Sequence, residues 1–354
     1  MLVNMSQMLD VAKRHHFAVG AFNISESNLV RTVIEAAEEA DSPAIIAVHP
    51  TELAYCKDEF VKYIVARASN SPVPFVIHLD HGDSIESVMR AIHAGFSSVM
   101  IDGSLLPFEE NIEKTAEVVR YCHMVDVSVE GELGTIGNTG TTIEGGITEV
   151  KYTDPDDAKQ FVEKTGVDTL AVAIGTCHGL YPKGVVPKLR MDVLTAIKEK
   201  IDIPLVLHGG SGNPDSEIAE AVRIGIQKVN ISSDYKSAFF TKAREILSQE
   251  NSGWDPNNLF PECINAAKKV VKQKMELFDS VGKAALYREE NIPQWRLFGC
   301  TLLNSLGMAL LKILKIEMNP SINYLLTYKK HLESSKIELK KSTIINPIAS
   351  FTMS

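Results

Sequence analysis

The sequence lacks the cysteine pairs and the export signal that mark secreted proteins. Its five cysteines, at positions 56, 122, 177, 263 and 300, are odd in number and show no C-x-x-C spacing, so neither a disulfide framework nor a thiolate zinc site is indicated. Residues 1–16 have no basic flank, apolar stretch and small-residue cleavage site of a signal peptide. We therefore expect a cytoplasmic protein in a reducing compartment.

Long apolar runs and an excess of positive charge are missing as well. The most apolar late stretch, residues 297–311, is shorter than the roughly 20 residues that cross a bilayer. Lys and Arg number 36 against 45 Asp and Glu, a net charge of −9, and no basic stripe stands out. Neither nucleic acid nor a membrane is therefore expected as a partner.

Short, β-branched apolar runs do recur along the chain, with charged segments of helical periodicity between them. This alternation predicts parallel strands covered by helices, and eight such units match an α/β fold of the (β/α)8 TIM barrel type. A doubly wound open sheet is the main competitor. The predicted strands are residues 17–24, 43–49, 74–81, 97–102, 127–134, 169–176, 204–210 and 228–233.

The end of the chain differs from the rest in character. After the eighth strand, residues up to 287 read as additional C-terminal helices, so 1–287 is expected to form the barrel with a helical arm. Residues 288–354 carry nine Lys and Arg against five Asp and Glu. We predict that 288–354 is an appended tail, either of low order or a small helical addition.

Polar residues gather where the predicted strands end. A barrel places all of these ends on one rim, where this fold builds its active sites, whereas an open sheet would spread them along an edge. The pattern favours the barrel. The residues are Asn23, His49, Asp80, His81, Asp102, Glu130, Glu132, His178, His208 and Asn230.

Three histidines among them suggest a metal site. His81, His178 and His208 follow the third, sixth and seventh strands, and three imidazoles from separate strands form an open catalytic zinc site. Each histidine alone is more often structural. Strand alternation turns Asp80 and His81 to opposite faces. The two residues therefore cannot both belong to the core, and at least one must face a cavity or solvent. His49 is expected to face the site and contact substrate.

Two loops after the last strands are suited to phosphate. The stretch "HGGSGNPD" (208–215) combines glycines with a following helix, which forms an anion nest, although a tight turn alone would also explain the glycines. The loop "NISSDYKSAF" (230–239) again puts hydroxyl residues before a helix. Phosphate usually docks at these loops in a barrel, so a phosphate ester is the expected substrate.

A metal ion beside a phosphate nest suits Lewis-acid chemistry on a carbonyl compound. Such an ion polarises the carbonyl so that the adjacent C–H can be ionised to an enediolate. Asp80, next to His81, is placed to exchange a proton with a substrate hydroxyl.

Six motifs, "HLDHG", "SVMIDGS", "VSVEGELG", "AIGTCHGLYP", "LVLHGGSG" and "KVNISSDY", resemble the class II, zinc-dependent fructose-bisphosphate and tagatose-bisphosphate aldolases. The resemblance covers residues 1–287, in order and at family spacing. It implies reversible aldol cleavage of a ketose 1,6-bisphosphate, in glycolysis and carbohydrate metabolism, to glycerone phosphate and glyceraldehyde 3-phosphate. It also implies a homodimer or homotetramer. Fructose and tagatose bisphosphates are not separated by the motifs.

The resemblance also implies roles for individual residues. His81, His178 and His208 correspond to the zinc ligands and Asp80 to the acid/base at the C4 hydroxyl. Asp102 and Glu132 match carboxylates that bind a second metal, a displaced zinc or a monovalent cation, or that only hydrogen-bond to the ligands. The residues matched to glycerone phosphate binding are Gly179, Lys183, Gly209, Gly210, Ser211, Asn230, Ile231, Ser232 and Ser233.

The chain departs from the family pattern in two places besides the tail. The family usually has a second histidine where Gly82 stands, and we expect the glycine to open space without removing a ligand. The family's proton-abstracting glutamate lies on the loop after the fifth strand, and we assign that role to Glu144. Two other readings stay open: a zinc hydrolase on the same barrel, and a phosphosugar-binding protein that has lost turnover.

Overall fold

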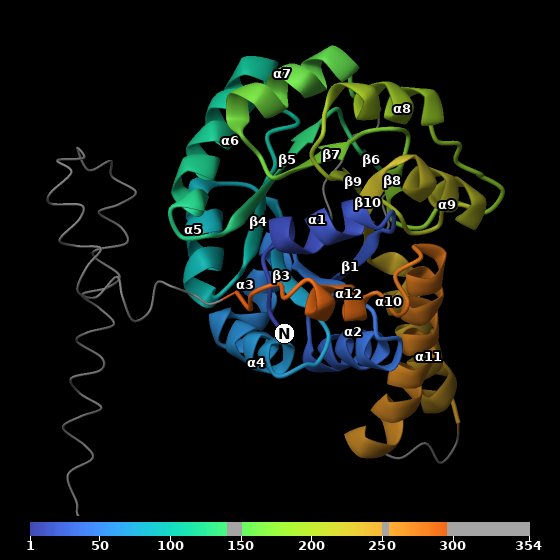
Figure 1. Ribbon diagram of the computed structural model, residues 1–354. Coiled ribbons are helices and arrows are strands. Elements are labelled where there is room, and N and C mark those ends of the chain that lie inside the picture. The colour runs from blue at the N-terminus through green and yellow to red at the C-terminus, as the bar shows by residue number, and fades with distance from the viewer. Residues whose placement is uncertain (140–150, 250–254, 296–354) are drawn as a thin grey trace, which may run out of the picture. The chain divides into compact units, whose positions relative to one another are not determined.

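The protein is described here by a computed structural model that covers residues 1–139, 151–249 and 255–295. Eight parallel strands close into a barrel in the order β1-β10-β9-β7-β5-β4-β3-β2 (Figure 1). This confirms the predicted TIM barrel and excludes the open sheet. The strands are β1 (Val19–Asn23), β2 (Ala44–Val48), β3 (Phe75–Gly82), β4 (Ser98–Ile101), β5 (Ser128–Leu133), β7 (Thr169–Val172), β9 (Leu205–Leu207) and β10 (Ile226–Ile231).

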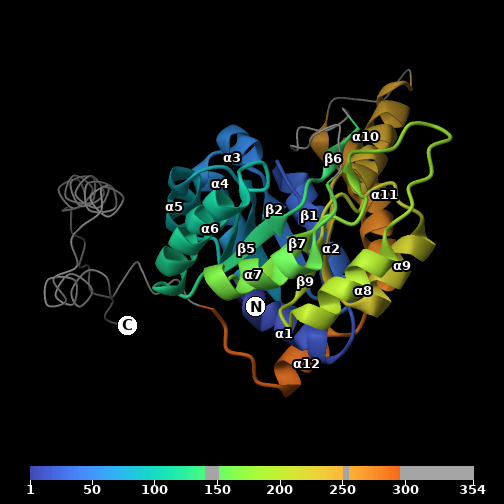
Figure 2. The same ribbon diagram turned by 90° about the horizontal axis from the view of Figure 1, so that it is seen from above.

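Helices surround the barrel, and α10 and α11 form the predicted C-terminal addition at its side (Figure 2). Local sequence signals set their ends: Ser84 caps the N-terminus of α5, and Gly95, at φ 112°, ends it. The helices around the barrel are α2 (Ser27–Glu39), α3 (Pro50–Cys56), α4 (Asp58–Ser69), α5 (Ile85–Ala94), α6 (Phe108–His123), α7 (Pro155–Thr165), α8 (Met191–Lys200), α9 (Asp215–Ile224), α10 (Ser233–Leu247) and α11 (Pro256–Leu277).

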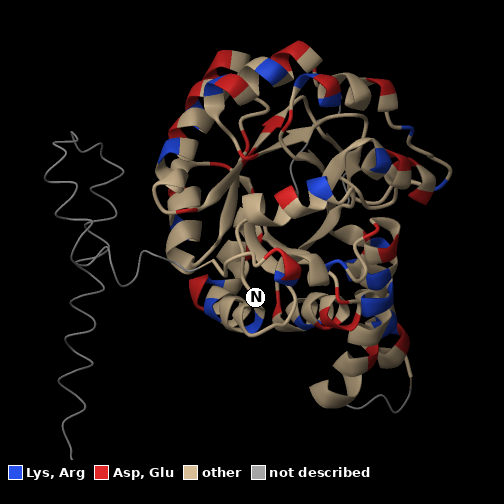
Figure 3. Cartoon of the chain, viewed as in Figure 1, with Lys and Arg blue, Asp and Glu red and all other residues tan. Residues whose placement is uncertain are grey.

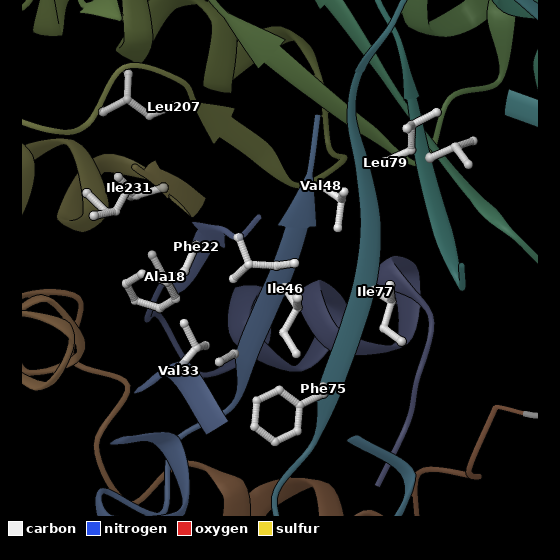
Figure 4. Packing of buried hydrophobic residues seen from close by; sticks show 14 of the residues in the cluster. Ala18, Phe22, Val33, Ile46, Val48, Phe75, Ile77, Leu79, Leu207 and Ile231 are labelled. Carbon is white, nitrogen blue, oxygen red and sulfur yellow. The ribbon is translucent and has the colours of Figure 1, made fainter. Parts of the chain in front are cut away.

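The two faces of each strand bury different chemistry. On β3, Phe75, Ile77 and Leu79 point outward into the apolar layer between strands and helices (Figure 4). On the opposite, inward face, Val76 packs in the apolar cluster at the strand starts, and His78 and Asp80 further along β3 are buried polar residues. The period of two therefore separates an apolar outer core from a polar upper interior.

The N-terminal end of the barrel is closed by α1 (Met5–Arg14), which lies across it in Figure 1. Its buried face, including Met8 and Leu9, packs on the first residues of the strands, such as Val19 and Val76. The Lys, Arg, Asp and Glu residues are found mainly on the outer helices (Figure 3). This end is therefore sealed by apolar packing, and chemistry is left to the opposite rim.

The chain past α11 returns to the barrel. The short helix α12 (Ala284–Glu289) ends near Arg288, which pairs with Asp41 at 3.2 Å. Trp295 is 4% exposed and donates its indole N–H to the Asp126 carbonyl. All described residues fall in one compact unit, Met1–Phe298, and residues 296–354 lie outside the described part. The boundary at 287/288 stays a prediction.

Within residues 1–139, 151–249 and 255–295, every helix is too short or too polar to span a bilayer.

Candidate active site and metal centre

Three imidazoles meet at the C-terminal rim of the barrel. His81 comes from the end of β3, His208 directly follows β9, and His178 lies in β8 (Cys177–His178), which pairs with β6 (Gly137–Asn138). One nitrogen of each ring lies within 4.8 Å of the others. The ring centroids of His81 lie 5.0 Å from those of His178 and 4.6 Å from those of His208. The three predicted ligands thus converge on one point.

An irregularity in β3 brings Asp80 and His81 to the same site. His81 has a φ of 50°, and the pairing with β4 shifts between Leu79 and Gly82, which marks a bulge. Both side chains are buried, Asp80 at 1% and His81 at 7% exposure. The expectation that alternation turns the two side chains to opposite faces was wrong, because the bulge interrupts the alternation at His81; neither residue belongs to an apolar cluster.

Gly82 leaves no open space, contrary to expectation. A Cβ built on it would lie 2.3 Å from the Met100 carbonyl oxygen of β4 and 2.9 Å from a methyl carbon of Leu79. The glycine therefore allows the bulged strand to approach β4 closely, and it does not enlarge the site.

Carboxylates orient two of the rings. The Nδ1 atom of His81 lies 2.9 Å from Asp102 Oδ2, and Nε2 of His208 lies 2.7 Å from Glu130 Oε1. The opposite nitrogens, His81 Nε2 and His208 Nδ1, are buried without a hydrogen-bond partner among the described residues. Two imidazoles thus aim bare nitrogens at the shared point, which fits a metal ion bound by neutral histidine nitrogens.

The surrounding charges favour a cation at this point. Burial opposes protonation of His81, but the hydrogen bond with Asp102 and the charges of Asp80 and Glu132 outweigh it and raise its pKa to about 10. Burial likewise opposes the charge of Asp80, yet His81, His208 and Lys228 lower its pKa well below the usual value. Burial, with Asp102 nearby, raises the pKa of Glu132 well above its usual value.

Two amides hold Asp80 in place. Asn23 on β1 donates to Oδ2 at 2.6 Å, and Asn230 on β10 donates to Oδ1 at 2.9 Å. The carboxylate also lies 3.9 Å from Nδ1 of His208. An ionised, oriented carboxylate next to the histidine cluster has the placement of a proton acceptor for a substrate bound there.

The two predicted phosphate loops lie together. Ser211 Oγ, after β9, accepts from the backbone N–H of Ser232, after β10, at 3.2 Å. Gly209 has a φ of 63°, and a Cβ there would meet the Cys177 carbonyl oxygen at 2.6 Å, so only glycine fits. A small cavity is lined by residues of both loops and their neighbours, namely Asn23, Gly179, Gly209, Ser211, Asn230, Ser232 and Ser233.

The remaining predicted site residues do not join the three histidines or the phosphate loops through their side chains in the described structure. His49 caps the N-terminus of α3 through Nδ1, and its ring lies 6.2 Å from that of His81. Lys183 is exposed, and Ile231 packs in the apolar core, so only the Ile231 backbone can serve a ligand. Glu144 lies outside the described residues.

The carboxylates of Asp102 and Glu132 form a second group with His81. One ligand atom from each of the three residues lies within 4.8 Å of the others. The group therefore offers a second position for a cation beside the three histidines, as the resemblance implies.

A wider cavity beside the loops was not predicted. It has a volume of about 520 Å³, and two basic side chains of α10, Lys236 and Arg244, line it. Lys236 donates to the buried Glu52 at 2.6 Å. The spacing of Ser233, Lys236 and Phe240 along α10 was the available signal, since residues three and four apart share a helix face.

Comparisons with known proteins agree with this geometry. Residues 3–283 match the family model described as fructose-bisphosphate aldolase class-II. A 6-phospho-5-dehydro-2-deoxy-D-gluconate aldolase of Bacillus licheniformis is 42% identical over 287 residues, covering 80% of this chain and 96% of that protein. A fructose-bisphosphate aldolase of Geobacillus stearothermophilus is 41% identical over 289 residues, covering 80% and 99%. The crystal structure of the YdjI aldolase from Escherichia coli K12 superposes with a TM-score of 0.71 at 36% identity, covering 80% of this chain and all of that one.

Proposed function

The chain belongs to the class II fructose-bisphosphate aldolase family and is a lyase acting on a phosphosugar, and we propose that it uses zinc to cleave a ketose 1,6-bisphosphate reversibly. The products would be glycerone phosphate and glyceraldehyde 3-phosphate. The observation that carries the proposal is the convergence of three histidine nitrogens within 4.8 Å, beside the two loops suited to phosphate. A zinc ion bound there would polarise the substrate ketone.

The chain's own residues supply binding and proton transfer. The two loops joined by the hydrogen bond between Ser211 and Ser232 bind the phosphate next to the ketone through backbone N–H groups and hydroxyls. Asp80 takes the proton of the C4 hydroxyl as the C3–C4 bond breaks and returns it in the synthetic direction. Asn23 and Asn230 fix the direction of its lone pairs. Glu144 remains the proposed base for the C3 proton.

The far end of the substrate needs a second anion site. The cavity lined by Lys236 and Arg244 adjoins Ser232 and Ser233, so Arg244 can meet a charged group on the aldehyde half, and Lys236 can do so if it exchanges its partner Glu52 for that group. A phosphate there makes the substrate a bisphosphate. This supports a ketose 1,6-bisphosphate, either fructose or tagatose.

A second candidate substrate is favoured by the 42% identical relative. That protein is named for 6-phospho-5-dehydro-2-deoxy-D-gluconate, whose far end is a carboxylate. Aldol cleavage next to its ketone would release the same phosphorylated three-carbon half. The two candidates therefore differ in the aldehyde half, which ends in a phosphate in the bisphosphate and in a carboxylate in the gluconate, and which has one hydroxyl fewer in the gluconate.

A coupled cleavage assay tests the proposal. Fructose 1,6-bisphosphate, tagatose 1,6-bisphosphate and 6-phospho-5-dehydro-2-deoxy-D-gluconate are compared, each with and without a chelator. We expect the highest kcat/KM on one of the bisphosphates and loss of turnover with the chelator, restored by zinc. A preference for the gluconate supports the second candidate. Ester hydrolysis without cleavage of a carbon–carbon bond, or tight binding with no turnover, would contradict both.

A further inference from the structure

A buried ion pair lies inside the barrel one layer below the metal centre. Lys228 on β10 and Glu130 on β5 are both 0% exposed. The Lys228 ammonium donates to both carboxylate oxygens of Glu130, at 2.9 and 2.7 Å. It also lies 3.3 Å from Nε2 of His78, whose Nδ1 is 2.9 Å from the Ser98 hydroxyl.

This pair is connected to the metal centre at a single ring. Oε1 of Glu130, which accepts from Lys228, also lies 2.7 Å from Nε2 of His208. The other nitrogen of that ring, Nδ1, is the buried atom without a described partner. Lys228, Glu130 and His208 thus form a chain of contacts that ends at a proposed ligand atom.

Stability alone does not account for the pair. Removing two charges from water costs several kcal/mol per ion, and apolar residues of similar volume often serve a core as well or better. Val19, the direct register partner of Lys228 on β1, packs with Ile45 and Val76 in an apolar cluster, so this part of the interior accepts apolar side chains. A charged pair at this position, in contact with His208, points to a role there.

We propose that Lys228 is a positioning residue that acts through Glu130 to make Nδ1 of His208 the metal-binding atom. The Lys228 ammonium donates to both oxygens of Glu130 and so fixes the carboxylate beside His208. Held in this way, the carboxylate accepts from Nε2 of His208, and the lone pair on Nδ1 faces the metal. The inference rests on the proposed function for the identity of the metal.

A comparison with His81 shows that orientation by a lysine and a glutamate is specific to His208. His81 uses the opposite arrangement, with Nδ1 toward Asp102 and Nε2 toward the metal centre. Asp102 is oriented by the hydroxyl and the backbone N–H of Ser104, and no lysine side chain contacts its carboxylate in the described structure. Loss of Lys228 should therefore alter His208 and leave His81 unchanged.

The experiment compares Lys228→Met, Glu130→Gln and the double variant with the wild type. Lys228→Met keeps the length of the side chain and removes its charge. Ser98→Ala is the matched control, because Ser98 lies in the same buried layer and contacts His78 but not Glu130. Zinc affinity of the metal-free protein is measured by competition with a chromophoric chelator. Nitrogen-15 NMR of labelled histidine reports which nitrogen of His208 carries the proton, and circular dichroism reports folding.

We expect wild-type metal-free protein to carry the His208 proton on Nε2. Lys228→Met and Glu130→Gln should each weaken zinc binding by about 10- to 100-fold. The double variant should be no weaker than the weaker single one, because both act by one route. Ser98→Ala should bind zinc like the wild type.

A folded Lys228→Met protein with unchanged zinc affinity overturns this inference but leaves the proposed function untouched. The proton of His208 on Nδ1 in the wild type overturns it as well, and that measurement needs no variant to fold. A wild-type protein that fails to bind zinc would instead overturn the proposed function.

Discussion

Replacement of Gly82 by alanine tests how tightly the bulge of β3 holds its metal ligand. The added Cβ would lie 2.3 Å from the Met100 carbonyl oxygen, and real Cβ contacts are essentially never shorter than 3.0 Å, so β3 and β4 must separate by about 0.7 Å, the difference between the two. Met100 is a paired residue of β4, matched with Glu130 of β5, so its carbonyl cannot move freely. The displacement is expected to fall on the bulge at His81.

This shift exceeds what a metal site tolerates. Ligand distances in metal sites hold within about 0.2 Å, so a shift of about 0.7 Å at His81 should weaken zinc binding by roughly 10- to 100-fold. Overpacking should in addition lower the free energy of unfolding by about 1–3 kcal/mol. Asp102 moves with the bulge, because its N–H donates to the Gly82 carbonyl.

The assay is chelator competition for zinc, with thermal unfolding of the metal-free protein measured in parallel. Gly20→Ala is the matched control in β1. Its Cβ would meet the ring of Phe22 at 2.6 Å and that of Phe278 at 3.3 Å, both side chains that can move. We expect Gly20→Ala to lose stability but to bind zinc like the wild type. A Gly82→Ala protein with wild-type stability and zinc affinity would refute the argument.

Three further predictions use other parts of the molecule. Asp80→Asn should lower kcat by about 10²- to 10⁴-fold and retain zinc, because it removes a proton acceptor but no proposed ligand; steady-state kinetics and a zinc assay check this. The raised pKa of His81, about 10 against 6.5, means that its proton is bound at neutral pH and is lost as the pH rises through about 10. Zinc binding at pH 8 should therefore release about one proton, measured by calorimetry in buffers of different ionisation enthalpy, and zinc affinity should rise with pH over this range. Truncation after Tyr287 should lower the unfolding temperature more than truncation after Trp295, because it removes the buried indole.

The barrel and the metal centre could be predicted because both follow from regular patterns. Apolar strands alternating with helices gave the fold, and polar residues at strand ends gave the rim. Strand-end positions reduced the ten histidines to His49, His81, His178 and His208, and the resemblance to the aldolase family identified the last three as ligands. The fold and the rim need only periodicity and the geometry of parallel strands.

The local geometry of β3 could not be predicted in the same way. The bulge depends on one residue, His81, adopting a positive φ that few non-glycine residues take, and the sequence "HLDHG" does not predict it. The reading of Gly82 failed for the same reason, because open space at a glycine depends on the distance to the next strand. Tertiary pairing with β4 decides both.

The buried charges were missed for a different reason. In the sequence, Lys228 begins an apolar run, which usually marks a residue at the solvent edge of a strand. Its partner Glu130 lies 98 positions away, so the pair exists only after the barrel closes. A bulge in β10, where the register shifts between Ile226 and Lys228, accompanies this inward placement.

The charges inside the barrel explain why a divalent ion suits this centre. The pKa values of three buried or half-buried carboxyl groups, Asp80, Asp102 and Glu130, are lowered despite burial, so all three are ionised. Lys228 offsets one of them through its pairing with Glu130. The pKa of Glu132 is raised instead, so Asp80 and Asp102 are the two carboxylates beside the three histidines whose pKa values favour the charged form, and this favours a divalent cation there. In the metal-free protein the proton on His81 offsets the charge of only one of these two carboxylates. A divalent ion that displaces this proton would balance both charges.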